Sequence, residues 1–255
     1  MKKIISNKIT LTILGIILFF FLWWLISVCV GNGNRIFPNP WDTIVYSANL
    51  LTSSYIYLCI GYSFMRMIIG FAVASVLGII LGAFVGNYKK TKYVFNPTMV
   101  ALKAIPTAAV VYLFMVVIGA ANAPIFIVML ITFPLVYEAT VSGFTHIPDT
   151  VLNSLKLDQT STIRNNVYVK FPMALPYIAL GLVSSFALSF KIEIMAEVIS
   201  GSTTYGIGSA IRIAQQDNPA NMLPVFGYSL IAIVFILIIS LILSLLKKKN
   251  SLSDD

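Results

Sequence analysis

Six long apolar segments constrain this chain more than any other feature of its sequence. A helix needs about 20 apolar residues to cross ~30 Å of hydrocarbon, and each segment reaches that length. Lipid offers the backbone no hydrogen-bond partners, so such segments must be helical. We therefore predict an all-α membrane protein whose six transmembrane helices lie at about residues 9–30, 62–86, 99–119, 124–145, 174–199 and 223–246.

The composition agrees with this class. Hydrophobic residues make up 58% of the 255 residues and charged residues only 10%, whereas a soluble domain is about a quarter charged. Because the spans and their loops occupy the whole chain, we expect residues 1–255 to form one transmembrane domain. The first span follows lysines, as a signal peptide would. It is longer than a signal-peptide core and no cleavage site follows, which favours a retained helix.

Lysine placement predicts the orientation. The net charge of +8 could indicate nucleic-acid binding, but the lysines lie in short clusters beside apolar segments, which is typical of membrane topology signals. We expect no nucleic-acid partner and a multi-pass protein of the plasma (inner) membrane. Both termini and the loops 87–98 and 146–173 carry the positive charge, so they are expected on the cytoplasmic side.

The sequence gives no indication of an enzyme. It has one histidine, His146, no metal-ligand spacing and no G-x-x-x-x-G-K-[ST] phosphate loop, so we expect no metal, no cofactor and no catalytic residues. Cys29 and Cys59 lie near the outer ends of the first two spans. They could pair, but two free thiols on the lipid side are more typical.

Two outer loops carry turn signals. Pro38 and Pro40 disfavour a helix in the segment FPNPWDT, so we expect a short external loop there. The 200–222 loop is rich in Gly, Ser and Thr, and its segment SAIRIAQQ could form a short helix. We interpret the Gly206 to Gly208 spacing as a turn. Pro106, Pro134 and Pro176 lie within or at the starts of spans, where proline kinks a helix.

Four charged residues within the spans need a physical reason to be there, because each costs about 2.5–3.5 kcal/mol at the bilayer centre. Glu193 and Glu197 are four residues apart and share a helix face, whereas Lys191 points about 200° away from Glu193. Three interpretations stay open: these residues line a translocation path, form a structural ion-pair network, or relay protons. Arg66 either reaches the outer headgroups or pairs with Glu193 or Glu197.

The segment 146–172 is the one long polar stretch between spans that suits a helix. Residues 149–158 follow Pro148 and open with an acid, which is typical of a helix start. Val151, Leu152, Leu155 and Leu157 give it an apolar stripe. A second short helix, about residues 161–169, leads to the fifth span. We predict a docking surface for a soluble partner, with a helix lying on lipid as the alternative.

Several motifs resemble one family, the membrane permease subunit of type I ATP-binding-cassette importers, in its nitrate, sulfonate, taurine and thiamine- or riboflavin-precursor branch. FPNPWDTI is similar to the family's proline-bearing segment, and Ser63 to Gly70 fits its S-x-x-R-x-x-x-G pattern. NPTMVALKAIPTAAVVYLFMVVIG is similar to its third span. The cytoplasmic signature Glu-Ala-Ala, three residues, Gly, nine residues, Ile-x-Leu-Pro keeps its spacing on Asn153, Ser154, Leu155, Gln159, Val169, Phe171 and Pro172, with only Pro172 identical.

The resemblance implies the function. It implies a translocation subunit that forms a homodimer, takes a small solute from an extracytoplasmic solute-binding protein and is driven by separate ATPase subunits docked on a coupling helix in 146–172. A sulfonate-, nitrate- or taurine-like anion is favoured, with a thiamine-precursor pyrimidine or a riboflavin-like cargo as the alternative. A different class, an ATP-independent secondary transporter or channel, would be expected to contain inverted repeats.

Overall fold

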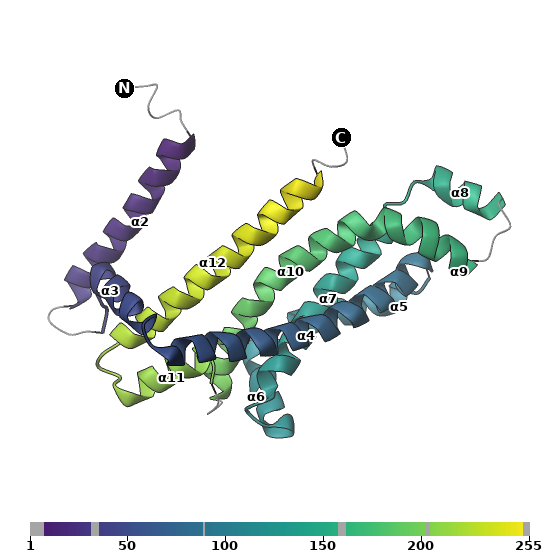
Figure 1. Cartoon of the computed structure of the whole chain (residues 1–255). Helices are drawn as coiled ribbons and strands as arrows, with labels where there is room; N and C mark the ends of the chain where they lie inside the picture. Colours follow the sequence, from purple (N-terminus) through teal and green to yellow (C-terminus); the bar gives the residue numbers. More distant parts are fainter. Residues whose placement is uncertain (1–7, 32–35, 89, 158–161, 202–204, 252–255) are drawn as a thin grey trace.

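A computed structural model describes residues 8–31, 36–88, 90–157, 162–201 and 205–251 of the chain. Its helices run the length of the described chain (Figure 1). They are α2 Lys8–Gly31, α3 Pro40–Leu50, α4 Ser54–Asn87, α5 Lys92–Ala104, α6 Thr107–Ile118, α7 Ala123–Thr145, α8 Asp149–Leu157, α9 Thr162–Asn165, a π-helical turn Asn166–Lys170, α10 Phe171–Ser200, α11 Ile207–Asp217 and α12 Leu223–Ser251.

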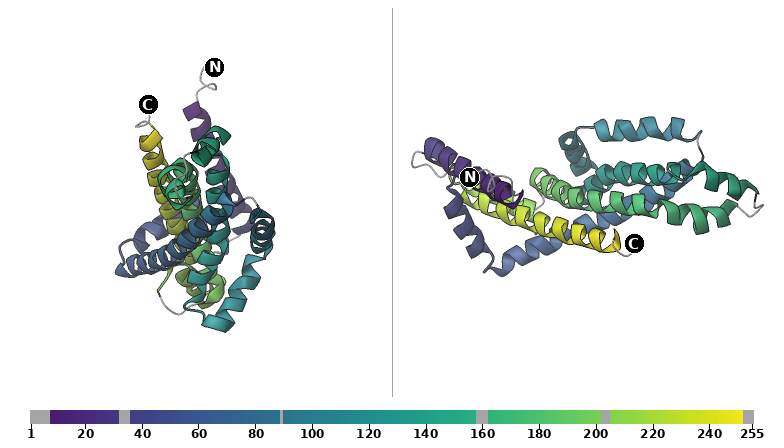
Figure 2. Two further views of the ribbon diagram at one scale, coloured as in Figure 1. Left: turned by 90° about the vertical axis from the view of Figure 1, so that its right-hand side faces the viewer. Right: turned by 90° about the horizontal axis from the view of Figure 1, so that it is seen from above.

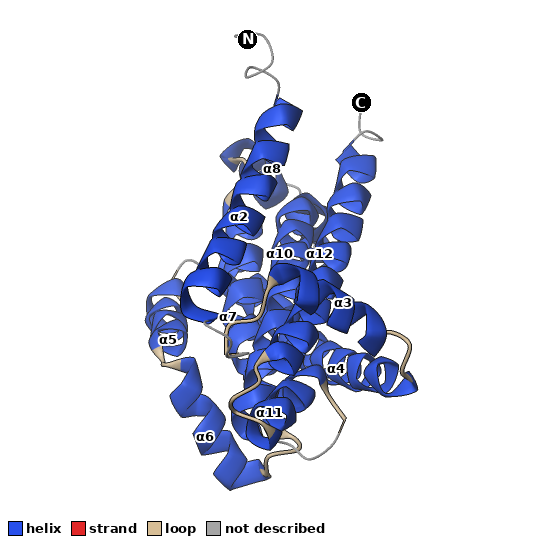
Figure 3. Cartoon of the chain, turned by 90° about the vertical axis from the view of Figure 1, so that its left-hand side faces the viewer, coloured by secondary structure: helices blue, strands red, loops and turns tan. Residues whose placement is uncertain are grey.

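Five of the six predicted spans are continuous helices. α2, α4, α7, α10 and α12 are each long and apolar enough to cross a membrane. Seen from above, α2 stands apart from the tightly packed middle of the molecule, where α4, α7 and α10 lie together (Figure 2). The described residues are otherwise helices joined by loops, without a strand among them (Figure 3). The predicted all-α membrane class is therefore confirmed.

The third predicted span is not one helix. α5 and α6 meet at a break and are bent by 91° from each other, so residues 99–119 form a broken pair. Ile105 has an extended backbone (φ −68°, ψ 128°), and Pro106 precedes α6 as its cap. The proline ring disfavours a helical residue before it, which explains the break at this dipeptide.

Small residues let α4 and α7 approach closely. Gly70, Gly78 and Gly82 on α4 face α7, and an added Cβ at Gly82 would lie 2.6 Å from the Cβ of Thr140. A row of small residues spaced by four is typical of helix pairs in membranes, where close backbone contact replaces the hydrophobic effect. This seam (Gly70, Gly78 and Gly82 against α7) fixes the centre of the fold.

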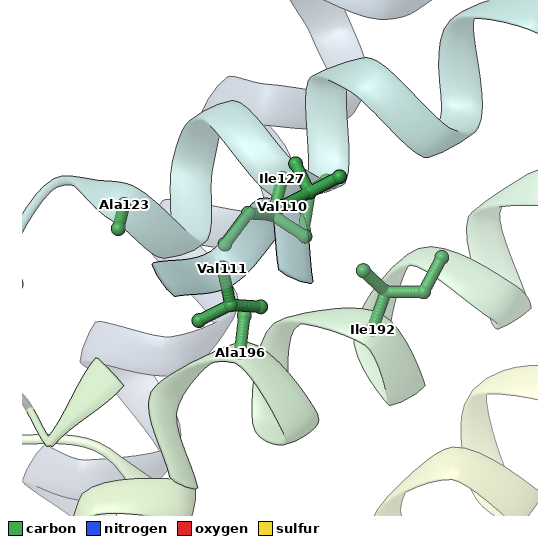
Figure 4. Close-up of a cluster of buried hydrophobic side chains, with 7 residues drawn as sticks. Val110, Val111, Ala123, Ile127, Ile192 and Ala196 are labelled. Atoms are coloured by element: carbon green, nitrogen blue, oxygen red, sulfur yellow. The ribbon is translucent and has the colours of Figure 1, made fainter. Parts of the chain in front are cut away.

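A buried apolar cluster joins α6 and α10 to α7. Val111 on α6, Ile127 on α7 and Ala196 on α10 are each fully buried. Figure 4 shows these side chains pointing toward one another with Val110 and Ile192 beside them. The cluster therefore holds the last turns of α10 in place against α6.

The prediction that Pro38 and Pro40 disfavour a helix in this segment was wrong for the second proline. Pro40 opens α3, and the Asn39 side chain accepts a hydrogen bond from the Trp41 amide at 3.0 Å. Proline suits the first position of a helix, because that position's N–H has no partner within the helix. α2 contacts this region through the Trp23 indole, which donates to the Pro38 carbonyl at 3.2 Å.

The two ends of the molecule differ. In Figures 1 and 3, α8, the start of α2 and the last turns of α12 lie toward one end, while α11 and the outer part of α6 lie toward the other. α10 connects the two ends, since it follows α8 and α9 and leads to α11. Any movement of the α8 end can therefore reach α11 through one continuous helix.

Candidate functional site

An ion pair lies inside the bundle between α4 and α10. Arg66 Nη1 lies 2.9 Å from Glu197 Oε1, and the two side chains are 8% and 0% exposed. The same Arg66 nitrogen donates to the Tyr205 carbonyl at 3.0 Å. Of the pairings expected for Arg66, the structure therefore contains the one with Glu197.

The Glu197 carboxylate also holds α11. Its Oε2 accepts a hydrogen bond from the Gly208 amide at 2.9 Å, and both of its oxygens accept from the Ser63 hydroxyl within 2.9 Å. Ser63 in turn accepts from the Ile207 amide at 2.9 Å. The first amides of a helix lack partners within the helix and carry partial positive charge, so a carboxylate stabilises that end.

Two glycines make this arrangement fit. An added Cβ at Gly206 would collide with the Glu197 carboxylate, and one at Gly208 would lie 2.6 Å from the Glu197 Cβ. We interpret the Gly206 to Gly208 spacing in the sequence as a turn. In the structure these glycines lie at the start of a helix whose first turn packs directly on the buried Glu197. Ser63 and Tyr205 were missed as well. The available signal was a Gly-x-Gly at the start of an amphipathic segment beside two intramembrane acids.

A second contact, made by Arg212, stabilises the junction between α10 and α11. Arg212 on α11 donates to the Ile199 carbonyl at 3.0 Å, at the last turn of α10. Gly201 adopts φ +62°, a left-handed conformation in which glycine meets no Cβ penalty. An added Cβ there would also collide with the Arg212 guanidinium. α11 is therefore fixed to α10 through Gly208 and Arg212, which lie four residues apart on one face of α11.

Glu193 occupies the next turn of α10 on the same face. It is fully buried, and within the described residues neither of its carboxylate oxygens has a hydrogen-bond partner. One turn further in, the Ser189 hydroxyl lies 2.9 Å from that of Thr132 on α7. Ser189, Glu193 and Glu197 form a buried polar row, so both acids point into the bundle.

Lys191 lies on the opposite face of α10. It is exposed on the single chain, and no ion pair to it occurs among the described residues. The four charged residues singled out in the sequence thus separate into a buried group and one exposed lysine. A second intramembrane pair joins α5 to α7, where Lys103 Nζ lies 2.6 Å from Glu138 Oε1.

The polar 146–172 segment contains α8, α9 and the π-helical turn, close to the two helices predicted there. Val151 and Leu152 pack against Phe144, Ile147 and Ala174, so much of the apolar stripe is used within the chain. The opposite side of α8 exposes Asn153 and Ser154, and Leu157 at its end is 83% exposed. Gln159 lies outside the described residues.

The segment continues without a break into α10. Val169 belongs to the π-helical turn. Phe171 opens α10 and packs against the same buried cluster as Val151 and Leu152. Pro172 is exposed and is the second residue of α10, directly after the π-helical turn. Lys170 Nζ donates to Asn87 Oδ1 at 2.9 Å, which ties the turn to the end of α4.

A groove of about 1420 Å³ opens beside α8. Its walls come from the end of α4, from α5, from the end of α7 and from α8 itself, and they include Leu152, Leu155 and Lys170. Both apolar and polar side chains line it. The groove separates α5 from α8 at the end of the molecule that also contains the start of α2.

Comparison with known proteins gives one consistent family. Residues 74–251 match the family described as binding-protein-dependent transport system inner membrane component. The nitrate import permease protein NrtB of Synechocystis is 26% identical over 251 residues, covering 94% of this chain and 87% of NrtB. The putative aliphatic sulfonates transport permease protein SsuC of Bacillus subtilis is 26% identical over 201 residues, covering 78% of this chain and 72% of SsuC.

A solved structure supports the fold. The crystal structure of an amino acid ABC transporter with histidines aligns with a TM-score of 0.60 and 19% identity, covering 78% of this chain and 97% of the other.

Proposed function

This chain belongs to the binding-protein-dependent transport system inner membrane component family, a family of ABC importer permeases in the plasma membrane, and we propose that it acts as one permease domain. Together with a second copy of itself, it forms the translocation pathway for a small anion. A solute-binding protein delivers the cargo on the outer side. A separate ATPase drives transport from the cytoplasmic side through the 146–172 segment.

The orientation follows from charge and from the position of α8. The start of α2, the last turns of α12 and α8 lie toward one end of the molecule (Figure 1). The lysine clusters of the sequence flank these elements, which supports placing that end in the cytoplasm. α11 and the 200–222 segment then lie at the outer side, where a binding protein releases its cargo.

The observation that carries the coupling proposal is the two-sided packing of α8. Its inner face, with Val151 and Leu152, rests on the ends of α7 and α10, while Asn153, Ser154 and Leu157 are exposed. A soluble partner that docks on the exposed face would push on a helix already packed against the bundle. The proposed contact is therefore the exposed side of α8, which includes Leu157 at the end of the predicted stripe, and not Val151 or Leu152.

α10 can transmit a displacement of α8 to the outer side. It runs from Phe171, which packs against the same apolar cluster as Val151 and Leu152 of α8, to Glu197, which holds the first turn of α11. Because packed helices move as rigid units, a displacement of α8 tilts α10 and carries α11 with it. This supports alternating access by rigid-body motion, in which closing of the ATPase subunits opens the pathway outward.

A homodimer is proposed because the single chain leaves charged and polar groups of α10 uncovered at membrane depth. Its anionic cargo is supported by the names of two relatives, which concern nitrate and aliphatic sulfonates. A thiamine-precursor pyrimidine or a riboflavin-like molecule is the second candidate cargo, and the same permease role holds for it.

Replacing Leu157 with aspartate is expected to weaken ATPase docking while the permease still inserts and folds. A buried interface anchor contributes about 2 kcal/mol or more, so recovery of the ATPase should fall at least roughly tenfold. The measurement is the amount of ATPase that co-purifies with the tagged full-length chain. Ile36, an apolar residue that is 49% exposed near α3, provides the matched control Ile36→Asp. Undiminished ATPase recovery with Leu157→Asp would contradict the assignment of this face.

A further inference from the structure

The intramembrane charges of α10 point in opposite directions. Glu193 and Glu197 are fully buried within the chain, and Glu197 is neutralised by Arg66. Lys191 is exposed on the far side of the helix. The only acids of α10 are therefore turned away from Lys191, and the exposed face of the helix carries a positive charge alone.

Lys191 belongs to a continuous strip of exposed residues. Ser184, Leu188, Lys191 and Met195 follow one another at intervals of four, three and four, which places them on one side of the helix. We name this the Lys191 strip. Its members are uncovered in the single chain, so something outside the chain or an aqueous space must lie against them.

The depth of Lys191 argues against lipid as that neighbour. It precedes the last residue of α10, Ser200, by nine residues, which is about 14 Å along the helix axis. A helix end at the membrane surface would place it within the hydrocarbon, which is ~30 Å thick. Charged side chains at such depth face a protein interior or a water-filled cavity rather than lipid.

The chemistry of lysine selects the ligand. Its ammonium group is a compact cation that donates three hydrogen bonds and accepts none. In a twofold homodimer each copy contributes one Lys191, so a path between two such strips presents two cations to its contents. An oxyanion is the complementary solute, because its oxygens accept charge-assisted hydrogen bonds.

We propose that the Lys191 strip lines the translocation path between two copies and that Lys191 binds the cargo, a small oxyanion, during its passage. The proposal rests on the dimeric permease function above and adds the cargo class and the residue that selects it. Glu193, Glu197 and Arg66 do not touch the cargo in this arrangement.

The first test uses the complex that co-purifies with the full-length chain, reconstituted in vesicles with binding protein and ATP. Uptake of nitrate and of methanesulfonate is measured for Lys191→Gln, Lys191→Arg and the control Lys90→Gln, which removes an exposed lysine outside the helices. Lys191→Gln removes both lysines of the homodimer and is expected to lower uptake of the transported anion at least roughly tenfold, because the loss of even one hydrogen bond to a charged group has about that effect. The arginine variant and the control should stay within about twofold of the unsubstituted complex.

The second test measures water access at position 191. In a Cys29→Ser background, the Lys191→Cys variant is treated with 2-sulfonatoethyl or 2-aminoethyl methanethiosulfonate, both of which are charged and react in water. Cys59 stays in place as a buried reference. The thiol introduced by Lys191→Cys is expected to react with both reagents. Only the aminoethyl adduct, which restores a positive charge, should restore uptake.

The outcomes separate the two proposals. Three outcomes would overturn the role of Lys191: unchanged uptake with Lys191→Gln, an arginine variant as weak as the glutamine variant, or no reaction of the thiol in the Lys191→Cys variant. ATP-driven uptake would still support the importer in each case. ATP-driven transport of neither anion by the unsubstituted complex would overturn the oxyanion assignment. Failure to recover any ATPase would count against the importer function itself.

Discussion

Replacing Arg66 with methionine is expected to destabilise the protein by roughly 3–5 kcal/mol, because it leaves the buried Glu197 carboxylate without its cation. Methionine keeps most of the side-chain volume, so the effect reports the lost charge more than a cavity. The Arg66→Met substitution also removes the hydrogen bond from Arg66 to the Tyr205 carbonyl, which lies just before α11. The measurement is thermal unfolding of the purified protein in detergent.

A second substitution tests the cause of that effect. Glu197→Gln removes the charge but keeps an oxygen that can accept from the Gly208 amide. The Arg66→Met/Glu197→Gln double variant is therefore expected to be more stable than Arg66→Met alone. If the two effects simply add, the ion pair is not what the buried arginine provides, and its packing must explain the loss.

Replacing Gly82 with leucine is expected to be the second most damaging change. An added Cβ at this position already lies 2.6 Å from the Thr140 Cβ and 2.9 Å from the Tyr137 carbonyl oxygen. Overpacking costs roughly 1–3 kcal/mol, and a leucine at this close helix contact should reach or exceed the upper part of that range. Thermal unfolding in detergent is again the measurement.

Gly61 supplies the matched control in the same helix. It is exposed, and an added Cβ would meet nothing within 4 Å. Gly61→Leu is expected to be neutral or slightly stabilising, since glycine is unfavourable within a helix. Equal losses from Gly61→Leu and Gly82→Leu would show that the α4–α7 seam does not hold the fold together.

The sequence predicted the spans well because length and hydropathy alone determine them. It failed where a single dipeptide decides the backbone. Ile105 and Pro106 break the third span, yet Pro134 and Pro176 lie inside continuous helices. A proline is tolerated where neighbouring helices accommodate the freed carbonyl, and that depends on tertiary packing which sequence does not reveal.

The sequence predicted which residues of the site are unusual but not which of them contact one another. Intramembrane charges marked Arg66, Glu193, Glu197 and Lys191 as unusual, and helical spacing put the two acids on one face. Which acid meets Arg66 depends on how α4 crosses α10. The apolar stripe of α8 illustrates the same limit, because periodicity shows that Val151 and Leu152 need a partner surface and cannot tell whether it lies in the same chain.

The part played by Gly206 and Gly208 required the structure. Their spacing fits many turns, and its meaning comes from Glu197, which lies nine residues before Gly206 and packs against both glycines. The acid, the helix start and the two glycines together form the contact. Only the packing of α11 against α10 brings them to one place.

The central claim is that this chain transports solute only together with an ATPase. The most direct measurement is uptake of nitrate and methanesulfonate into vesicles that contain the tagged full-length chain and whatever co-purifies with it, with and without ATP. We predict that an ATP-hydrolysing subunit co-purifies and that uptake requires both ATP and a solute-binding protein. Recovery of the chain alone, together with uptake that does not depend on ATP, would contradict the account and identify an autonomous transporter or channel.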